Sequence, residues 1–234
     1  MSVKAPLQIF SRLIEGLPSK QRKQLLNGCE PVDLVFGHVL HEANQPIRHV
    51  YFPLSGFISL VTTLDGHQPL EMGLIGNEGV LGATLALGVS QAPMRAVVQG
   101  SGSALRISSQ LFRQQLLKSP ALLLTLKRYL YVVMAQLSQS AACTHFHEIE
   151  PRLARWLLMT HDRAHADHFH LTHEFLADML GVRRSGVSIA AALLQARGLI
   201  SYSRGEIIIL DRAGLELAAC ECYAALQADY RAQF

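Results

Sequence analysis

Residues 171–200 read LTHEFLADMLGVRRSGVSIAAALLQARGLI and contain the most specific pattern in the chain. Thr172 suits a helix N-cap, and Glu174 in the first turn complements the helix dipole. Gly181 stands where the chain must turn sharply between two helices. The positions that seal two steeply crossing helices are small or apolar: Leu176, Ala177, Leu180, Val182, Val187 and Ala190. This pattern predicts a helix-turn-helix. An ordinary helical hairpin is the alternative, but it rarely has the Ala, Gly and Val together.

The second of these helices is expected to begin near Arg184 and to end before Gly198, a good C-terminal stop. The outer face of its N-terminal end carries Arg183, Arg184, Ser185 and Ser188. Recognition helices enter the major groove of DNA by that end. We therefore expect Arg184 to contact a guanine, whose O6 and N7 match a guanidinium, and Arg183 to contact a phosphate. A solvated surface charge is the alternative for each arginine.

The charge pattern supports a DNA-binding module in this region. Between Met179 and Gly205 there is no Asp or Glu, whereas there are four arginines, Arg183, Arg184, Arg197 and Arg204. The net charge of the whole chain is only +3, so the excess is local. A local cationic patch suits a small module that docks on phosphates.

A wing is predicted after the recognition helix. The runs 199–203 and 207–210 flank the turn Arg204-Gly205-Glu206 and form a short hairpin, with Arg204 at the tip and within reach of the DNA backbone. Asp211 is then expected to cap a final helix through Leu215, Leu217 and Cys220. The predicted DNA-binding residues are Thr172, Arg183, Arg184, Ser185, Ser188 and Arg204.

The N-terminal half has a different texture. Apolar residues at helical spacing (Leu7, Phe10, Leu13, Ile14 and Leu17) predict a helix before Pro18, and a second short helix runs through Leu25 and Leu26. From about residue 33 to 106, short apolar runs (50–52, 57–61, 96–98 and 104–107) alternate with turn residues such as Asp65-Gly66 and Gly76-Asn77. This pattern indicates an antiparallel β-sandwich or β-roll.

A long helix is predicted from Ser119-Pro120 to about His145, because the segment has no internal Gly or Pro. Its three-four spacing forms a heptad seam: Leu123, Leu126, Leu130, Val133, Leu137, Ser140 and Thr144. Such a helix is either the spine of a core or half of a two-chain coiled coil, and the polar C-terminal positions favour the dimer. A further helix is expected from Pro151 to about Ala164, with Leu153, Trp156, Leu157 and Thr160 on one face.

The predicted class is therefore α+β, in three parts. They are an effector domain over residues 1–118, a dimerisation helix over 119–147 and a winged helix-turn-helix over 148–234. The apolar fraction of 50% fits a globular protein, and no apolar run is long enough to span a membrane. The segment MSVKAPLQIF does not resemble a secretion signal, so we expect a cytoplasmic protein.

Other chemistries find little support in the sequence. Enzyme motifs such as G-x-S-x-G, a P-loop, H-E-x-x-H and a dinucleotide fingerprint are missing, so no catalytic residue is predicted. A ligand-binding or scaffold protein that uses its helix-turn-helix for protein contacts is disfavoured by the acid-free arginine patch. The cysteines Cys29, Cys143, Cys220 and Cys222 match neither a zinc ribbon nor C-x-x-C, so reduced thiols and no metal site are predicted.

Histidine is abundant around the predicted domain boundary. His161, His165, His168, His170 and His173 crowd one stretch, and His145 and His147 precede it. Their spacing suits metal or haem ligation, but a polar interdomain loop is the simpler interpretation. Cys143 with His145 near the seam leaves a redox or haem sensor open.

The layout as a whole resembles the Crp/Fnr family of bacterial regulators. The resemblance covers nearly the full chain and is strongest in residues 171–210 and in Gly76-Asn77-Glu78-Gly79, which resembles the family's phosphate-binding cassette. It implies a homodimer that binds an inverted repeat in double-stranded DNA, no membrane association, and RNA polymerase as a protein partner. It also implies an effector in the β-roll that alters how the two recognition helices are presented.

The resemblance places the effector pocket at Gly76, Glu78, Gly79, Arg95, Leu137 and Ser138. Glu78 matches the family's ribose-binding acid, but Ala92-Pro93 stand where cyclic-AMP members have an Arg-Ser pair, and Arg95 is out of phase. Because a buried anion needs a positive partner, these departures argue against cyclic AMP. A cyclic-nucleotide-responsive or a haem- or redox-responsive member remains the alternative.

Two further departures concern the operator and the oxygen-sensing branch. Ser185 and Ile189 replace a glutamate and a second arginine on the recognition helix, so the operator of the best-known members does not transfer. Cys29 and Cys143 are too few for the clustered N-terminal cysteines of the oxygen-sensing branch, which argues against its iron–sulfur cluster.

Overall fold

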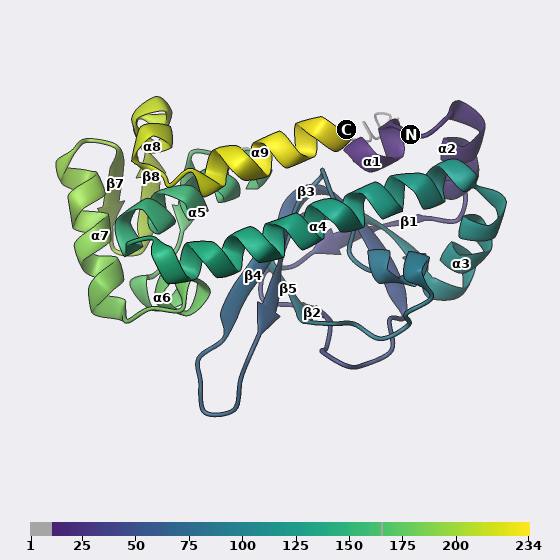
Figure 1. Cartoon of the computed structure of the whole chain (residues 1–234), viewed down its shortest axis with the longest axis horizontal. Coiled ribbons are helices and arrows are strands. Elements are labelled where there is room, and N and C mark those ends of the chain that lie inside the picture. Colours follow the sequence, from purple (N-terminus) through teal and green to yellow (C-terminus); the bar gives the residue numbers. More distant parts are fainter. Residues whose placement is uncertain (1–10, 165) are drawn as a thin grey trace, which may run out of the picture.

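The chain folds into two lobes along one long helix, α4 (Pro120–Phe146), as Figure 1 shows. The structure is a computed structural model that describes residues 11–164 and 166–234, so Leu7, Phe10 and His165 lie outside the described residues. The larger sheet lies in the N-terminal lobe, and a smaller sheet with short helices lies in the C-terminal lobe. The predicted antiparallel β-roll, long helix and winged helix-turn-helix are all confirmed.

Two short helices precede the sheet, α1 (Arg12–Glu15) and α2 (Ser19–Leu26). The predicted break before the second helix is present, since Gly16 is the C-cap of α1 and Pro18 is the N-cap of α2. Leu13, Ile14 and Leu25 are buried in the core of the N-terminal lobe.

The larger sheet is antiparallel and has the order β1-β5-β3-β4, with β2 paired to β5. Its strands are β1 (Glu30–Leu34), β2 (Val39–His41), β3 (His49–Thr62), β4 (Leu70–Ile75) and β5 (Arg95–Ser108). The predicted turn at Asp65-Gly66 lies between β3 and β4.

The sequence predicts four short strands where the structure has two long ones, β3 and β5, each of 14 residues. The reason is a bulged bend at Gly56, which has a φ of +72°. A Cβ at this position would lie 2.3 Å from the carbonyl oxygen of Gly100 on the neighbouring strand. The glycine therefore bends a continuous strand instead of ending it.

Helix α4 follows a 3₁₀ helix η1 (Ala83–Leu87), strand β5 and helix α3 (Ser109–Lys118). Ser119 caps α4 by accepting a hydrogen bond of 3.2 Å from the backbone N–H of Leu122. One face of α4 packs against its own chain through Leu122, Leu126, Tyr129, Val132, Gln136, Ser140 and Cys143. Leu126 has 0% exposure, so this predicted seam residue, like Ser140, faces its own chain and not a partner helix.

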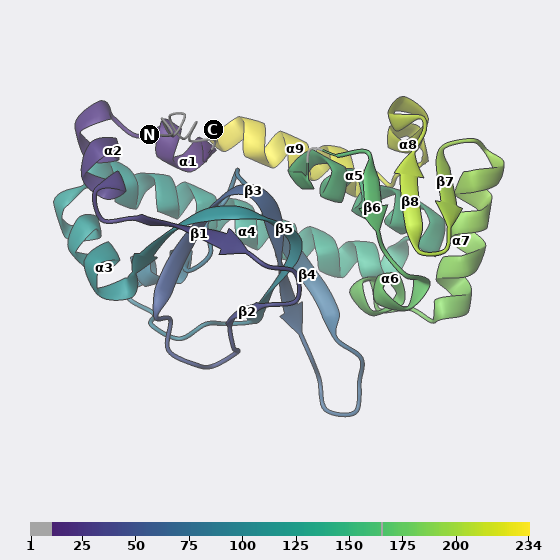
Figure 2. The same cartoon turned by 180° about the vertical axis from the view of Figure 1, so that it is seen from behind.

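The C-terminal lobe contains α5 (Ile149–Ala164), α6 (His173–Leu180), α7 (Arg184–Ala196) and α8 (Arg212–Ala218). Its sheet has the order β6-β8-β7, formed by β6 (His168–His170), β8 (Glu206–Ile209) and β7 (Ile200–Ser203), as Figure 2 shows. The predicted two-stranded wing is thus three-stranded. The stretch that we interpreted as a polar loop supplies the third strand, in which Phe169 packs into the core of the lobe.

A helix that the sequence analysis missed, α9 (Cys222–Gln233), runs back along α4 (Figures 1 and 2). The predicted final helix, capped by Asp211 as expected, ends at Ala218, before Cys220. Leu226 of α9 is buried with Phe57 of β3 and Met159 of α5. The C-terminal helix therefore packs against both lobes.

None of the described helices is both long enough and apolar enough to cross a membrane.

Candidate nucleic-acid interface and effector region

The helix-turn-helix has the geometry that the sequence predicts. Thr172 caps α6 by accepting a hydrogen bond of 3.1 Å from the backbone N–H of Phe175. Gly181 adopts the left-handed conformation, with a φ of +64°, and so permits the sharp turn into α7. The sealing residues Leu176, Ala177, Leu180, Val187 and Ala190 are buried, and Val182 is half-buried.

The N-terminal end of α7 presents unpaired cations. Arg183 and Arg184 are exposed there, and Arg204 is exposed on the wing. Within residues 11–164 and 166–234, no carboxylate forms an ion pair with any of these three arginines. Arg197 differs, because its Nη1 lies 2.8 Å from Glu150 Oε1 of α5. The acid-free patch therefore contributes three free arginines, not four.

A stacked pair of rings, which the sequence analysis missed, adjoins this end of α7. The rings of His173 and Tyr202 are nearly parallel, with centroids 4.2 Å apart. Ser188 Oγ shares a hydrogen bond of 2.8 Å with His173 Nδ1 and donates another, of 3.1 Å, to the carbonyl oxygen of Arg184. Burial, and then the charge of Arg184, lower the pKa of His173. In the sequence, His173 directly follows the predicted N-cap. This position could have shown that His173 belongs to the helix-turn-helix, whereas we assigned the histidines of this stretch to a polar loop.

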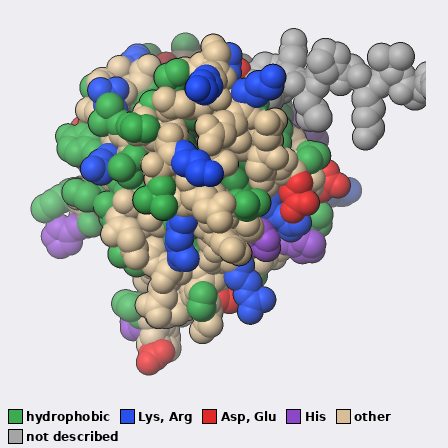
Figure 3. Space-filling model, turned by 90° about the vertical axis from the view of Figure 1, so that its right-hand side faces the viewer, with side chains coloured by type: hydrophobic (Ala, Val, Ile, Leu, Met, Phe, Trp, Pro, Cys, Tyr) green, Lys and Arg blue, Asp and Glu red, His purple; other side chains and the backbone are tan. Residues whose placement is uncertain are grey.

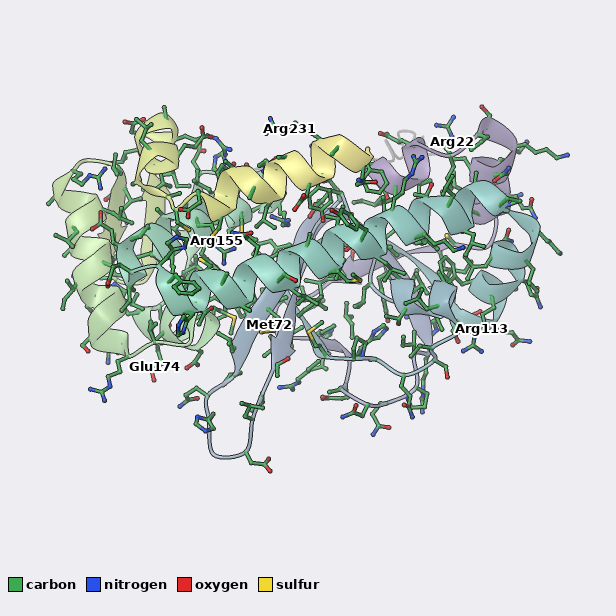
Figure 4. All side chains as sticks on the ribbon, viewed as in Figure 1. Arg22, Met72, Arg113, Arg155, Glu174 and Arg231 are labelled. Atoms are coloured by element: carbon green, nitrogen blue, oxygen red, sulfur yellow. The ribbon has the colours of Figure 1, made fainter. Side chains whose placement is uncertain are left out.

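The tip of the wing lies close to the same end of α7. Arg204 has a φ of +51°, so the hairpin turn carries an exposed arginine in a conformation that most side chains avoid. A hollow of about 470 Å³ lies between the wing and the two helices. Its lining residues are Thr172, His173, Glu174, Arg184, Tyr202, Arg204 and Gly205, and Glu174 lies on α6 (Figure 4).

The opposite end of the molecule is cationic in a different way. Helices α2 and α3 carry Lys20, Arg22, Lys23, Arg113 and Lys118. Figure 3 shows that Lys and Arg at this end are scattered among neutral and apolar side chains. Arg184 and Arg204, by contrast, line a common hollow.

Contacts with carboxylates account for most of the described histidine-rich stretch. His168 and His170 of β6 lie 2.6 Å and 2.5 Å from the carboxylate oxygens of Glu206 on β8. His161 lies 2.5 Å from Asp167. The contacts with Glu206 join β6 to β8, and the contact with Asp167 joins the end of α5 to the segment before β6.

The six residues predicted for an effector pocket are not brought together. Arg95 pairs with Glu42 at 3.3 Å on the surface, whereas on α4 Leu137 is half-buried and Ser138 is exposed. The cavity between the sheet and α4 has a volume of only about 60 Å³, and none of the six lines it. Mostly apolar side chains line it, together with His41, Thr84 and Tyr129, so its lining contains no Lys or Arg that could balance a phosphate.

Glu78, the predicted ribose-binding acid, has another partner. Its Oε1 lies 2.7 Å from Arg163 Nη2 of α5, and both side chains are nearly buried, at 11% and 8% exposure. Glu78 Oε1 also accepts a hydrogen bond of 3.2 Å from the backbone N–H of Gly76. The cassette-like turn therefore contacts the C-terminal lobe. An open cavity of about 760 Å³ lies beside this pair, between the lobes.

A second acid links the sheet to the same helix. Glu71 of β4 accepts hydrogen bonds from Trp156 Nε1 at 2.8 Å and from Ser59 Oγ at 2.5 Å. Burial raises the pKa of Glu71 to about 7. The segment after β3 is thus connected to α5 by two carboxyl groups.

Comparison with known proteins agrees with these observations. Residues 32–119 match the cyclic nucleotide-binding domain, and residues 151–218 match the Crp-like helix-turn-helix domain. The chain belongs to the Crp/Fnr family. Members of the Crp/Fnr family are DNA-binding transcription regulators and not enzymes, as the sequence predicts. No match was found among curated protein sequences.

Solved structures share the Crp/Fnr fold at low sequence identity. A Crp/Fnr transcriptional regulator from Eubacterium rectale is 16% identical, with a TM-score of 0.68 over 89% of this chain and 98% of that one. FixK2 from Bradyrhizobium japonicum is 15% identical, with a TM-score of 0.69 over 82% and 98% of the two chains. The c-di-GMP-responsive regulator CLP from Xanthomonas campestris is 16% identical, with a TM-score of 0.66 over 82% and 99%.

Proposed function

We propose that the protein is a homodimeric transcription regulator that binds an inverted-repeat operator with α7 in the major groove. The convergence of Arg184 at the start of α7 with Arg204 at the wing tip carries this proposal, because free cations on one hollow suit a phosphate backbone. RNA polymerase is the protein partner that this function implies. Action on chromosomal DNA implies a cytoplasmic location.

The exposed side chains of α7 suggest how bases are contacted. Arg184 contacts a guanine, while Arg183 and Arg204 contact phosphates. Ile189 and Leu193 on the same helix are exposed at 63% and 47%. Exposed aliphatic side chains at this position suit thymine methyl groups, so we expect an operator half-site that contains both G·C and A·T pairs.

The dimer contact is proposed on the outward face of α4, one residue further along than the predicted seam. This face is formed by Leu124, Lys127, Tyr131, Met134, Ser138, Ala141 and His145, which keep the three-four spacing and are all exposed. Leu124, Tyr131 and Met134 are exposed at 52%, 53% and 64%. Large apolar side chains in this number on one helix face suit a partner helix. The half-buried Leu123, Leu130, Val133 and Leu137 then border the contact.

We propose that a signal acts on the two carboxylate contacts between the N-terminal lobe and α5. These contacts are the Glu78–Arg163 ion pair and the Glu71–Trp156 hydrogen bond. A ligand or modification that breaks either link changes the position of the recognition helices in the dimer. The small apolar cavity supports neither cyclic AMP nor another cyclic nucleotide as that signal, since a bound phosphate would lack a cation.

The DNA-binding proposal is tested by selecting operators from random duplexes and then measuring affinity for the selected site. Arg184→Ala is expected to weaken binding by about 1–3 kcal/mol and to relax preference at one position. Arg113→Ala, which removes an equal charge at the far end of the molecule (Figure 4), serves as the control. Equal affinities of the two variants, or no selected sequence at all, would contradict the proposal.

The dimer proposal is tested by sedimentation. Tyr131→Glu combined with Met134→Glu is expected to give folded monomers, because both side chains are exposed in one chain and face each other across the dimer. Leu126→Glu, at a fully buried site, is instead expected to disrupt folding. A dimer that persists in the Tyr131/Met134 double variant shows that the chains associate elsewhere.

A further inference from the structure

Three cysteines and one histidine gather where the two lobes meet. Cys143 and His147 lie at the C-terminal end of α4, while Cys220 and Cys222 lie at the start of α9. The ligand atoms of all four lie within 4.8 Å of one another. Cys143, Cys220 and Cys222 form a small cluster of buried thiols, none of which is in a disulfide.

The distances fit ligands of a single ion. The Sγ atoms of Cys143 and Cys220 are 3.6 Å apart, and Cys222 Sγ lies 3.4 Å from His147 Nδ1. A disulfide requires about 2.05 Å. Zn–S bonds of about 2.3 Å in a tetrahedron separate two sulfur ligands by about 3.8 Å. We propose that Cys143, His147, Cys220 and Cys222 bind one Zn²⁺ tetrahedrally.

The neighbours of these side chains support the proposal independently. His147 Nε2 donates a hydrogen bond of 3.1 Å to Glu221 Oε1, which leaves Nδ1 facing the thiols. Zinc-binding histidines are typically oriented in this way by a carboxylate. Gln139 Nε2 also donates to Cys222 Sγ at 3.0 Å, and such a bond stabilises a thiolate.

The local charge also suits a thiolate-rich zinc site. Zn²⁺ with three thiolates and a neutral histidine carries one net negative charge, and binding releases the three thiol protons to solvent. Arg155 of α5, 9% exposed, interacts electrostatically with Cys143 and Cys220. Its Nε and Nη1 are buried and have no hydrogen-bond partner in the described part of the chain. Figure 4 shows Arg155 in the region where α4, α5 and the start of α9 converge.

The ligand set selects among metals. Three sulfur ligands exclude Mg²⁺ and Ca²⁺, which prefer oxygen, whereas Zn²⁺ accepts both sulfur and nitrogen. An iron–sulfur cluster would divide the four ligands between different irons, whereas all four ligand atoms lie within 4.8 Å of one another, as suits a single ion. With four protein ligands and no open position, the zinc would be structural.

The site has a consequence for the arrangement of the lobes. Its ligands come from α4 and from the start of α9, and α5 begins two residues after His147. Zinc would therefore hold the end of the proposed dimer helix to the C-terminal helix and keep α9 along α4. Loss of the metal is expected to release α9 and to loosen the connection between α4 and the helix-turn-helix.

The experiment begins with the full-length protein purified without chelators. We expect native mass spectrometry and elemental analysis to find one zinc per chain, and mercurial titration of the thiols to release it. Replacement by Co²⁺ is expected to give the intense visible bands of a tetrahedral cobalt–thiolate centre. A chain that binds neither zinc nor cobalt overturns the proposal, as does iron with inorganic sulfide, or a Cys143–Cys220 disulfide in protein kept reduced.

Variants then test the ligands. Cys222→Ser and His147→Ala are expected to lower zinc affinity at least 100-fold, and Glu221→Ala about 10-fold because the histidine loses its orienting partner. Cys29→Ser, which removes the one cysteine outside the cluster, is the matched control and is expected to keep full zinc content. Equal zinc affinity in Cys222→Ser and Cys29→Ser overturns the assignment. The wild-type cobalt spectrum decides the matter if a ligand variant does not fold.

Discussion

The charged residues at the start of α7 and on the wing differ from those between the two lobes in whether they have a partner within the protein. Arg183, Arg184 and Arg204 are exposed and have no acidic partner in the described part of the chain. Between the lobes, Glu78 is paired with Arg163 and Glu71 is hydrogen-bonded to Trp156. Free charges are available to an external ligand, whereas buried and paired charges are engaged within the protein. Glu78 thus shows that an acid at the position of a family's ligand-binding residue can instead join two lobes.

The largest expected effect tests the buried pair between the lobes. Arg163→Met leaves Glu78 buried without its cation and is expected to lower the free energy of unfolding by about 3–5 kcal/mol. Urea denaturation measures this change. Arg95→Met, which breaks the exposed pair with Glu42, is the control and is expected to have a small effect. Similar urea midpoints for the two variants would show that the Glu78–Arg163 pair does not hold the lobes together.

The second prediction concerns the pH dependence of the other link. Because burial raises the pKa of Glu71 to about 7, the folded chain binds a proton here that the unfolded chain has lost. Stability is therefore expected to fall by up to roughly 3 kcal/mol as the pH rises from about 4.5 to about 7, and then to level off. Arg155 and Arg163 act against this shift, since their charges lower the pKa of Glu71.

Fluorescence can follow this titration, since Trp156 is the only tryptophan and donates a hydrogen bond to Glu71. The wild-type emission is expected to change with a midpoint near pH 7, and Glu71→Gln is expected to abolish the change. Glu174→Gln, on the exposed surface of α6, should leave it intact. A transition that survives in Glu71→Gln would assign the titration to another group.

The smallest expected effect tests Arg204, the exposed arginine at the tip of the wing. Asparagine adopts a positive φ more readily than arginine, so Arg204→Asn should preserve the wing turn and the stability of the lobe. Loss of one phosphate contact is expected to weaken all DNA sequences about equally and to reduce the log–log salt slope by about 0.9. A change in sequence preference would instead place Arg204 on a base.

Where a pattern depends on neighbours along the chain, the sequence predicted this protein well. The N-caps predicted at Thr172 and Asp211 are both present, because a capping side chain needs only a backbone N–H two or three residues away. The same local logic divided β3 into two runs, 50–52 and 57–61, which the structure joins through the bulge at Gly56. A glycine has the same appearance in a turn and in a bulge, and only the neighbouring strand distinguishes them.

The face of α4 shows what periodicity leaves open. The heptad over Leu123 to Thr144 correctly indicated a long helix with an apolar stripe, but it selected Leu126 and Ser140, which pack against their own chain. Two sets of residues on α4, offset by one position, share this spacing. Only the position of the N-terminal lobe shows which of the two faces is covered. The partner of Glu78 was missed for a related reason, since Arg163 lies 85 residues further along the chain.

The amino-acid sequence was sufficient to predict the helix-turn-helix and the hairpin of the wing, because the spacing of apolar, capping and turn residues reflects the backbone geometry of one helix or one hairpin. Tertiary structure alone decided which face of α4 is exposed, that Arg163 meets Glu78, and that Cys143 and His147 meet Cys220 and Cys222. Those contacts join residues distant in the chain, and no local pattern encodes them. They arise when two lobes and a returning helix bury their faces against one another.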